Sequence, residues 1–229
     1  MLRTASAAML LLFDVDSHAI VEHDDWHTHE HMPERLSLPG FLRASRWVAR
    51  SGTPRYLVMY EVRDLDMLVA APYLARLNDP TPWTAKMMRS YVGMRRALCK
   101  VEASAGAGLG RTALLARFTV DEDRAGESRD WLAREILPAL AGMPGIASVD
   151  VVAQAVAAPM TREQRIRGND AGLDHAVLVT GYEAGALAEI AGDKLHSKHF
   201  VARGAAVAED AIGLYDQAVS MTAGDISRQ

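Results

Sequence analysis

Four histidines lie within nine residues of this 229-residue chain, at His23, His27, His29 and His31. On an α-helix His23, His27 and His31 follow one row at i, i+4 and i+8, whereas His29 points away, towards solvent. Two buried imidazoles lower each other's pKa, so a neutral base is expected near neutral pH. General acid–base help of this kind contributes about 10²- to 10⁴-fold, which suffices for isomerisation, elimination or enol chemistry on an activated substrate.

The segment that carries these histidines occurs twice in the chain. Residues 10–45 align without a gap with residues 115–150. The residues that are identical in both copies are, in first-copy numbers, Leu10, Phe13, Val15, Asp16, Glu22, Asp25, Trp26, Glu30, Pro33, Pro39 and Gly40. His27 lies opposite Leu132 and His31 opposite Ile136, which is the pattern of a core-facing stripe in the second copy. We therefore expect both imidazoles to point inward and the first copy to hold the chemistry.

The residues leave three roles open for His27 and His31. They could contact a ligand or catalyse, they could be hydrogen-bonded structural histidines or lie at the repeat interface, or they could bind a metal. Histidines at i and i+4 can hold zinc, here with His23 or Glu30, although the arrangement is not that of a HExxH motif. Because Glu30 recurs as Glu135 in the copy without histidines, we interpret it as a structural ion pair or cap.

The pattern of apolar and turn residues predicts the order β-α-β-β-α-β in each half, the ferredoxin-like unit. The predicted elements of the first half are strand 10–15, a helix over 25–36 capped by Asp24 or Asp25, strands 41–49 and 55–62, a helix over 65–77, more helix to residue 91 and strand 95–102. Those of the second half are strands 112–120, 146–153, 175–182 and 213–221, with a helix over 128–140 before the second of them.

The chain is thus predicted to be α+β, with ferredoxin-like repeats at 1–104 and 111–229 joined by a glycine- and alanine-rich linker at 103–110. An arginine-rich insertion at 156–173 is expected to form a loop or arm. Each sheet leaves one face uncovered, so the two repeats should pack as a dimeric-type α/β barrel within one chain. Side chains near the mouth of that barrel are then candidates for binding a small molecule.

Three further residues are candidates for substrate binding. Arg46 and Tyr60 lie on predicted strands, where an arginine could hold a carboxylate or phenolate and a tyrosine could donate a hydrogen bond. Trp83 lies in a proline-containing loop that could close a pocket. Surface, interface or core positions are the alternative for all three.

Composition excludes several classes of function. The 25 basic and 29 acidic residues give a net charge of −4 and form no basic stripe, so a nucleic acid is not an expected partner. No apolar run approaches the roughly 18 to 20 residues of a membrane span, and Asp14 and Asp16 argue that residues 1–13 form a strand rather than a signal peptide. Cys99 is the only cysteine, which predicts a cytoplasmic protein without an internal disulfide.

The first repeat resembles the EthD-like branch of the dimeric α/β-barrel superfamily. The residues that carry the resemblance are Trp26-His27-Thr28-His29-Glu30-His31-Met32-Pro33, Leu38-Pro39-Gly40-Phe41 and Arg46. His31 occupies the histidine position of that family. The resemblance implies relatives such as muconolactone isomerases, polyketide cyclases, cofactor-free monooxygenases and haem-binding branches, most of which act on small aromatic or lactone-like molecules without a metal.

The prediction is therefore an enzyme of isomerase, lyase or cyclase type, without a cofactor, acting on an aromatic, enone or lactone-like molecule. His31 is expected to transfer the proton and His27 to assist, while the second repeat serves as scaffold. The alternatives are a haem-dependent or cofactor-free monooxygenase, and a non-catalytic binding or stress-response barrel. A homodimer of the fused chain stays open.

Overall fold

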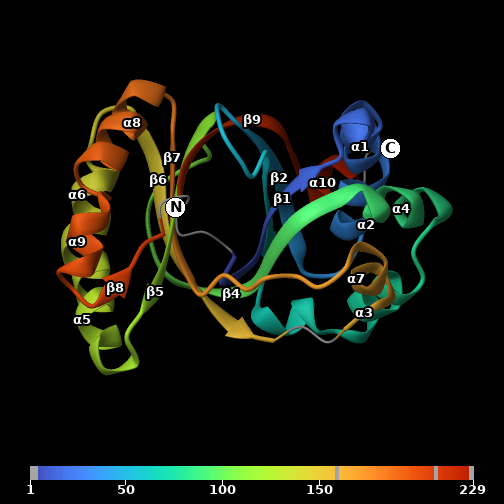
Figure 1. The fold of residues 1–229 in the computed structure, drawn as a ribbon, viewed down its shortest axis with the longest axis horizontal. Helices are drawn as coiled ribbons and strands as arrows, with labels where there is room; N and C mark the ends of the chain where they lie inside the picture. The colour runs from blue at the N-terminus through green and yellow to red at the C-terminus, as the bar shows by residue number, and fades with distance from the viewer. Residues whose placement is uncertain (1–4, 158–159, 209–210, 227–229) are drawn as a thin grey trace.

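Eight antiparallel strands close into a barrel in the computed structural model of this chain (Figure 1). Their bounds are β1 (Ala7–Val15), β2 (Phe41–Ala49), β3 (Tyr56–Val62), β4 (Tyr91–Gly106), β5 (Thr112–Val120), β6 (Ile146–Val156), β7 (His175–Gly181) and β9 (Ile212–Thr222), and the short β8 (Ala205–Ala206) pairs with the end of β5. The structure describes residues 5–157, 160–208 and 211–226. Parts of the predicted opening strand (1–4), insertion (158–159) and second repeat (209–210 and 227–229) lie outside the described residues.

Each half contributes four neighbouring strands to the barrel. Their order is β4-β1-β3-β2 in the first half and β9-β5-β7-β6 in the second. The halves join where β2 pairs with β9 and where β4 pairs with β6. The predicted linker at 103–110 is too long, because β4 continues to Gly106 along β6 and the small residues of this segment fit into the ladder.

An apolar cluster to which all eight barrel strands contribute fills the barrel interior. Along β1, Leu10 and Leu12 point into the barrel and the alternate residues Met9 and Phe13 point out towards the helices, as the period of two in a strand requires. Trp47, which is fully buried, is part of the interior cluster. His27 and His31 are not part of this interior cluster. They point inward from their helix, as expected, but they are buried between the outer side of the sheet and the helices.

The helices cover the barrel on two opposite sides (Figure 1). On the first-half side are η1 (Ser17–Ala19), α1 (Ile20–Trp26), the π-helical turn η2 (His27–His31), α2 (Met32–Leu36), η3 (Leu65–Leu68), α3 (Ala71–Asn78), α4 (Pro82–Met87), η4 (Met88–Ser90) and α10 (Ala223–Ile226). On the other side are η5 (Glu122–Arg124), α5 (Ala125–Trp131), η6 (Leu132–Ile136), α6 (Leu137–Ala141), α8 (Ala184–Gly192) and α9 (Ser197–Val201). Within the described ranges, no helix is long and apolar enough to cross a membrane.

The insertion of the second half forms α7 (Arg162–Arg167) and crosses to the side of the first half (Figure 1). There α7 contacts α3, α4 and η4. The sequence predicted a loop or arm for this insertion. The structure shows that it contains a short helix, and that this helix docks on the first half, which the sequence did not indicate.

The histidine helix begins earlier than predicted, at Ile20 instead of residue 25. The polar residues before Trp26 were expected to form a loop, but they lie on the helix. Glu22 is on its outer face, where it binds Lys86 of α4, while His23 and Trp26 are buried on its inner face. Neither Asp24 nor Asp25 acts as an N-cap, because both lie inside the helix.

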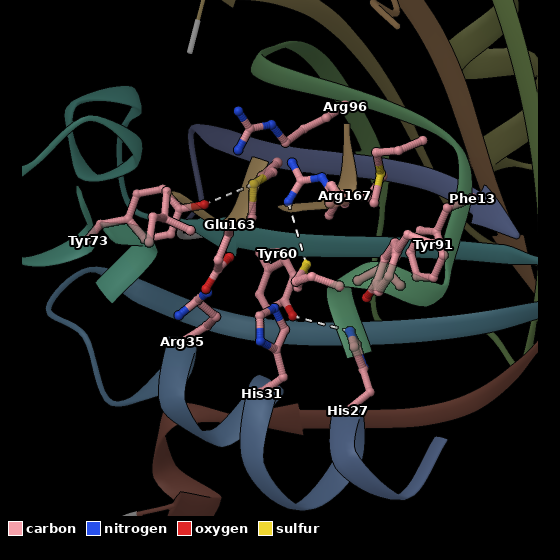
Figure 2. A pocket seen from close by; sticks show the side chains of 16 residues that line it. Phe13, His27, His31, Arg35, Tyr60, Tyr73, Tyr91, Arg96, Glu163 and Arg167 are labelled. Carbon is pink, nitrogen blue, oxygen red and sulfur yellow. Dashed lines mark hydrogen bonds and ion pairs between the residues drawn. The ribbon is translucent and has the colours of Figure 1, made fainter. Parts of the chain in front are cut away.

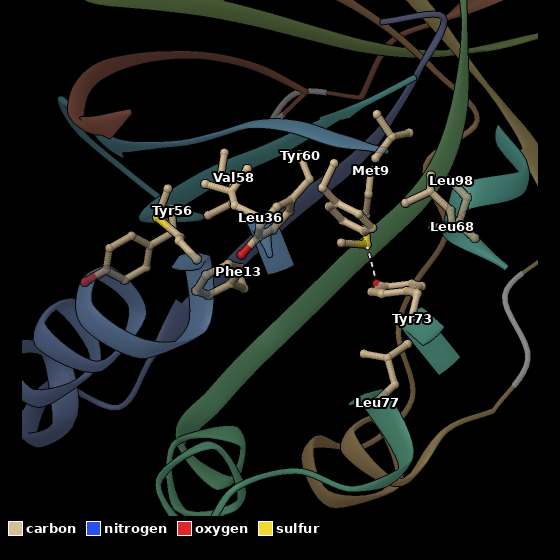
Figure 3. Close-up of a cluster of buried hydrophobic side chains, with 14 of the residues drawn as sticks. Met9, Phe13, Leu36, Tyr56, Val58, Tyr60, Leu68, Tyr73, Leu77 and Leu98 are labelled. Carbon is tan, nitrogen blue, oxygen red and sulfur yellow. Dashed lines mark hydrogen bonds between the residues drawn. The ribbon is translucent and has the colours of Figure 1, made fainter. Parts of the chain in front are cut away.

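The core of the first half lies between the outer face of the sheet and α2 and α3 (Figure 3). Met9, Phe13 and Tyr60 from the strands pack there with Leu36 of α2 and Tyr73 of α3. This layer holds the histidine helix against the sheet and thereby forms one wall of the candidate site.

Candidate functional site

A π-helical turn determines how the histidines are presented. Met32 N–H donates to the carbonyl of His27, five residues back, instead of four. Pro33 has no N–H and its ring would clash with the carbonyl four residues before it, so a widened turn suits this position. The extra residue brings Trp26 and His31 onto one face, with ring centroids 4.5 Å apart.

His23, His27 and His31 form a buried row on this helix. Neighbouring ring centroids are 5.4 Å apart between His23 and His27, and 5.5 Å apart between His27 and His31. Nε2 of His23 lies 3.3 Å from the hydroxyl of Tyr91. Nε2 of His27 lies 3.5 Å from the hydroxyl of Tyr60 (Figure 2). The Nδ1 atoms of His27 and His31 are buried and have no hydrogen-bond partner among the described residues.

His27 and His31 line a cavity between the outer face of the sheet and the helices (Figure 2). The other lining residues come from β1, α2, β3, α3, η4, β4 and α7: Met9, Leu11, Phe13, Arg35, Val58, Tyr60, Tyr73, Leu77, Met88, Tyr91, Met94, Arg96, Glu163 and Arg167. The cavity volume is about 20 Å³, which is room for roughly one water molecule. A ring-sized ligand must therefore displace side chains, and the three methionines are the most adaptable of them.

Burial makes both imidazoles neutral. It lowers the pKa of His27 well below the ordinary value of 6.5, and the neighbouring His23 and His31 lower it further. The pKa of His31 is also lowered well below 6.5 by burial and then by the nearby Arg35 guanidinium. Burial raises the pKa of the Tyr60 phenol, so its O–H is retained as a donor.

The arm from the second half closes one end of the cavity with a buried ion pair. Glu163 Oε1 accepts from Arg35 Nη2 at 2.6 Å, and the two side chains are 2% and 1% exposed. Arg35 also donates to Glu34 at 2.8 Å. The second half is therefore more than a scaffold, because its insertion contributes lining residues to the site.

Two arginines that line the cavity, Arg96 and Arg167, share one aspartate, Asp170. Arg167 binds Asp170 with Nε and Nη2, at 2.9 and 2.6 Å, and Arg96 Nε lies 3.1 Å from the same carboxylate. The sequence analysis did not name Glu163 or Arg167 as site residues. The arginine-rich composition of the insertion was the only feature that pointed to this segment.

Arg46 and Trp83 do not line the cavity, whereas Tyr60 does. Arg46 is buried behind the helix, where it donates to the carbonyl of Asp24 and to Thr28 Oγ1, both at 3.2 Å. It therefore supports the turn that carries the histidines. Trp83 Nε1 donates to Glu22 at 3.1 Å, which ties α4 to α1.

Glu30 and His29 occupy the positions expected of structural and solvated residues. Glu30 Oε1 accepts from Trp26 Nε1, Thr81 Oγ1 and Thr84 Oγ1, so it joins the histidine helix to α4. These contacts direct the Glu30 carboxylate towards α4 and away from the histidine row. His29 is exposed.

The donor set fits neither a metal ion nor haem. Among the described residues, no group of three or more His, Cys, Asp or Glu side chains is arranged to hold a metal ion. A ligand of drug or haem size requires several hundred Å³, against a cavity of about 20 Å³ that is crossed at one end by the Arg35–Glu163 ion pair. Haem would have to break this ion pair, which the residues present do not favour.

Acidification is expected to destabilise the protein. The pKa values of His23, His27 and His31 are lowered in the folded state, so between 6.5 and those values the unfolded chain binds more protons than the folded one. Stability is therefore complete above about pH 6.5 and falls below it, by up to about 1.4 kcal/mol per pH unit for each imidazole. Urea unfolding at pH 7.5 and 5.5 measures this loss.

The second half provides the matched control for this titration. Leu132 and Ile136 occupy the positions of His27 and His31 there and are buried. The double variant His27→Leu, His31→Ile should flatten the dependence of stability on pH, whereas His29→Gln should leave it unchanged. An equally steep loss in the double variant would mean that other groups cause it.

No protein family matches the sequence, and no curated protein matches it. Several solved structures share its fold over nearly its whole length. An anthrone oxidase-like protein has a TM-score of 0.64 and 14% identity, covering 96% of this chain and 94% of its own. A candidate monooxygenase from Fusobacterium nucleatum has a TM-score of 0.63 and 8% identity, covering 95% and 94%. A chlorite dismutase from Candidatus Nitrospira defluvii has a TM-score of 0.57 and 10% identity, covering 98% and 95%. At these identities the likeness shows the fold alone, an antiparallel eight-stranded barrel flanked by helices.

Proposed function

We propose that this protein is an enzyme that moves a proton on a small aromatic, enone or lactone-like substrate, with His31 as the base and His27 as its neighbour. The observation that carries the proposal is a pair of buried imidazoles with lowered pKa values, whose Nδ1 atoms have no hydrogen-bond partner among the described residues, beside a cavity with apolar, phenolic and charged walls. A neutral imidazole in such a place can accept a proton at neutral pH.

In the proposed step an acidic C–H or O–H bond of the substrate breaks. The proton goes to a ring nitrogen of His31, and the electron pair stays on the substrate as an enolate or phenolate. The Tyr60 O–H, whose phenol keeps its proton, stabilises the developing negative charge by donating a hydrogen bond. Return of the proton to another atom of the substrate completes an isomerisation. In an elimination, the bond to a leaving group breaks instead, and the leaving group departs with the electron pair of that bond and takes the proton from His31. Neither step needs a cofactor.

The test is hydrogen exchange into small enones, lactones and hydroxyaromatics in deuterated water, followed by proton NMR. We expect the wild-type protein to exchange the acidic hydrogen of at least one compound faster than buffer does. Ligands that bind tightly without exchange or turnover would instead favour the non-catalytic barrel.

A cofactor-free oxygenase is the second candidate, favoured by the anthrone oxidase-like and candidate monooxygenase neighbours. It begins with the same deprotonation, after which the electron-rich substrate anion reduces O₂ directly. Oxygen uptake that depends on substrate and on His31 would select this candidate, whereas turnover under argon would select the isomerase or lyase.

We also infer that residues 1–104 and 111–229 are tandem ferredoxin-like repeats, and that the first belongs to the EthD-like branch. The shared strand order supports this inference, as do the π-helical turns η2 and η6 at aligned positions, each followed by a proline, Pro33 or Pro138. Expression of each half alone, tested for a folded circular dichroism spectrum, would show whether the repeats are independent units.

A further inference from the structure

Arg167, on the arm from the second half, is a polar group of the cavity that the proton-transfer step does not use. We propose that it anchors an anionic group of the substrate, so that the cavity takes small organic acids or phenolates. The anionic oxygen would replace the sulfur of Met88 as the acceptor for Nη1 of Arg167. This inference rests on the proposed function in taking the same cavity as the binding site.

The hydrogen bonds of Arg167 leave one of its nitrogens poorly partnered. Nε and Nη2 bind Asp170, whereas Nη1 donates to Met88 Sδ at 3.8 Å (Figure 2). A thioether is a weak acceptor, and the Arg167 side chain is only 4% exposed, so solvent does not compensate. A buried guanidinium N–H gains most from an ionised acceptor such as a carboxylate.

The charges of the cavity are unevenly distributed. One carboxylate, that of Asp170, is shared by two guanidinium groups, those of Arg96 and Arg167. Arg35, by contrast, faces two carboxylates, Glu34 and Glu163, and offers no place for an anion. An anionic ligand is therefore held by Arg167, with the rest of the molecule in the cavity that the histidines also line.

A second donor in the same cavity also has sulfur as its acceptor. The hydroxyl of Tyr73 donates to Met9 Sδ at 3.2 Å (Figure 2). Met9 and Met88 have flexible side chains that can move aside at small cost. Their movement would enlarge a cavity that is now almost filled and would expose two strong donors to the oxygens of a ligand.

The test compares benzoate, 4-hydroxybenzoate and 2-naphthoate with their neutral amides, by thermal shift and calorimetry at pH 7.5. We expect at least one acid to bind the wild-type protein at least tenfold more tightly than its amide. Arg167→Met should weaken acid binding by about 10- to 100-fold and leave amide binding unchanged. Arg165→Met, at an exposed position of the same helix, is the matched control and should keep the preference.

Several outcomes would overturn the proposal: no acid stabilises the wild-type protein, the amides bind as tightly as the acids, or Arg167→Met keeps the preference. Should Arg167→Met not fold, Arg167→Lys decides, because it keeps the charge and loses the planar fork. The preference should then fall but not vanish, and an unchanged preference counts against the proposal. Because binding is read without turnover, His31→Gln should keep the preference for acids. A preference for acids without any turnover would count against the proposed function alone, and turnover without this preference would count against the anion site alone.

Discussion

Replacing His31 by glutamine is expected to slow substrate turnover or hydrogen exchange by about 10²- to 10⁴-fold. The amide keeps a polar side chain of similar length but cannot accept a proton at neutral pH. Stability should change little, since the Nδ1 atom of His31 has no hydrogen-bond partner to lose among the described residues. Exchange rates measured beside urea unfolding curves for the same variant separate the two effects.

Two other histidines provide controls for this variant. His27→Gln should have a smaller effect, because His27 contacts Tyr60 and supports the base without being the base itself. His29 is exposed, so His29→Gln should behave as wild type. Full activity in His31→Gln, or a loss of activity that only follows a loss of stability, would contradict the proposed role.

Replacing Glu163 by alanine is expected to destabilise the protein by about 3 kcal/mol, the lower end of the range for breaking a buried ion pair. Arg35 would be left with Glu34 as its remaining carboxylate partner, in a place where both members of the original pair are almost fully buried. The same change frees the arm from the first half, so turnover should fall as well. Urea unfolding monitored by tryptophan fluorescence measures the stability.

The double variant Arg35→Met, Glu163→Met tests the cause of this loss. Removing both charges should recover most of the stability, because an apolar pair of similar volume avoids the cost of desolvating two ions. A single variant that costs less than about 1 kcal/mol would show that the arm is not held by this pair.

Much of the fold followed from periodic patterns that are local in the sequence. The strand predicted at 41–49 agrees with β2, and the aliphatic residues Leu132 and Ile136 correctly indicated that His27 and His31 are buried. The barrel was predictable because each of the two predicted sheets leaves one face that must be covered.

The parts that could not be predicted depend on contacts between distant residues. Glu163 meets Arg35 across 128 positions, and no local pattern indicates where a six-residue helix in an insertion will dock. The polar residues that precede Trp26 were interpreted as a loop. They lie on a helix whose outer face is contacted by α4, where Lys86 binds Glu22, a contact that no local pattern indicates. Arg46 has a suitable side chain on a suitable strand, yet only the structure shows that it faces the back of the helix.

A neutral base at His31 is tested most directly by an NMR titration of the imidazole nitrogens, with His27→Leu and His31→Ile used to assign the signals. Because burial lowers its pKa well below the ordinary value, His31 is expected to stay neutral through pH 6.5 and to take a proton only well below it. A His31 that is protonated at pH 7, or that titrates at the ordinary value near 6.5, would contradict the claim that this cavity holds a neutral base.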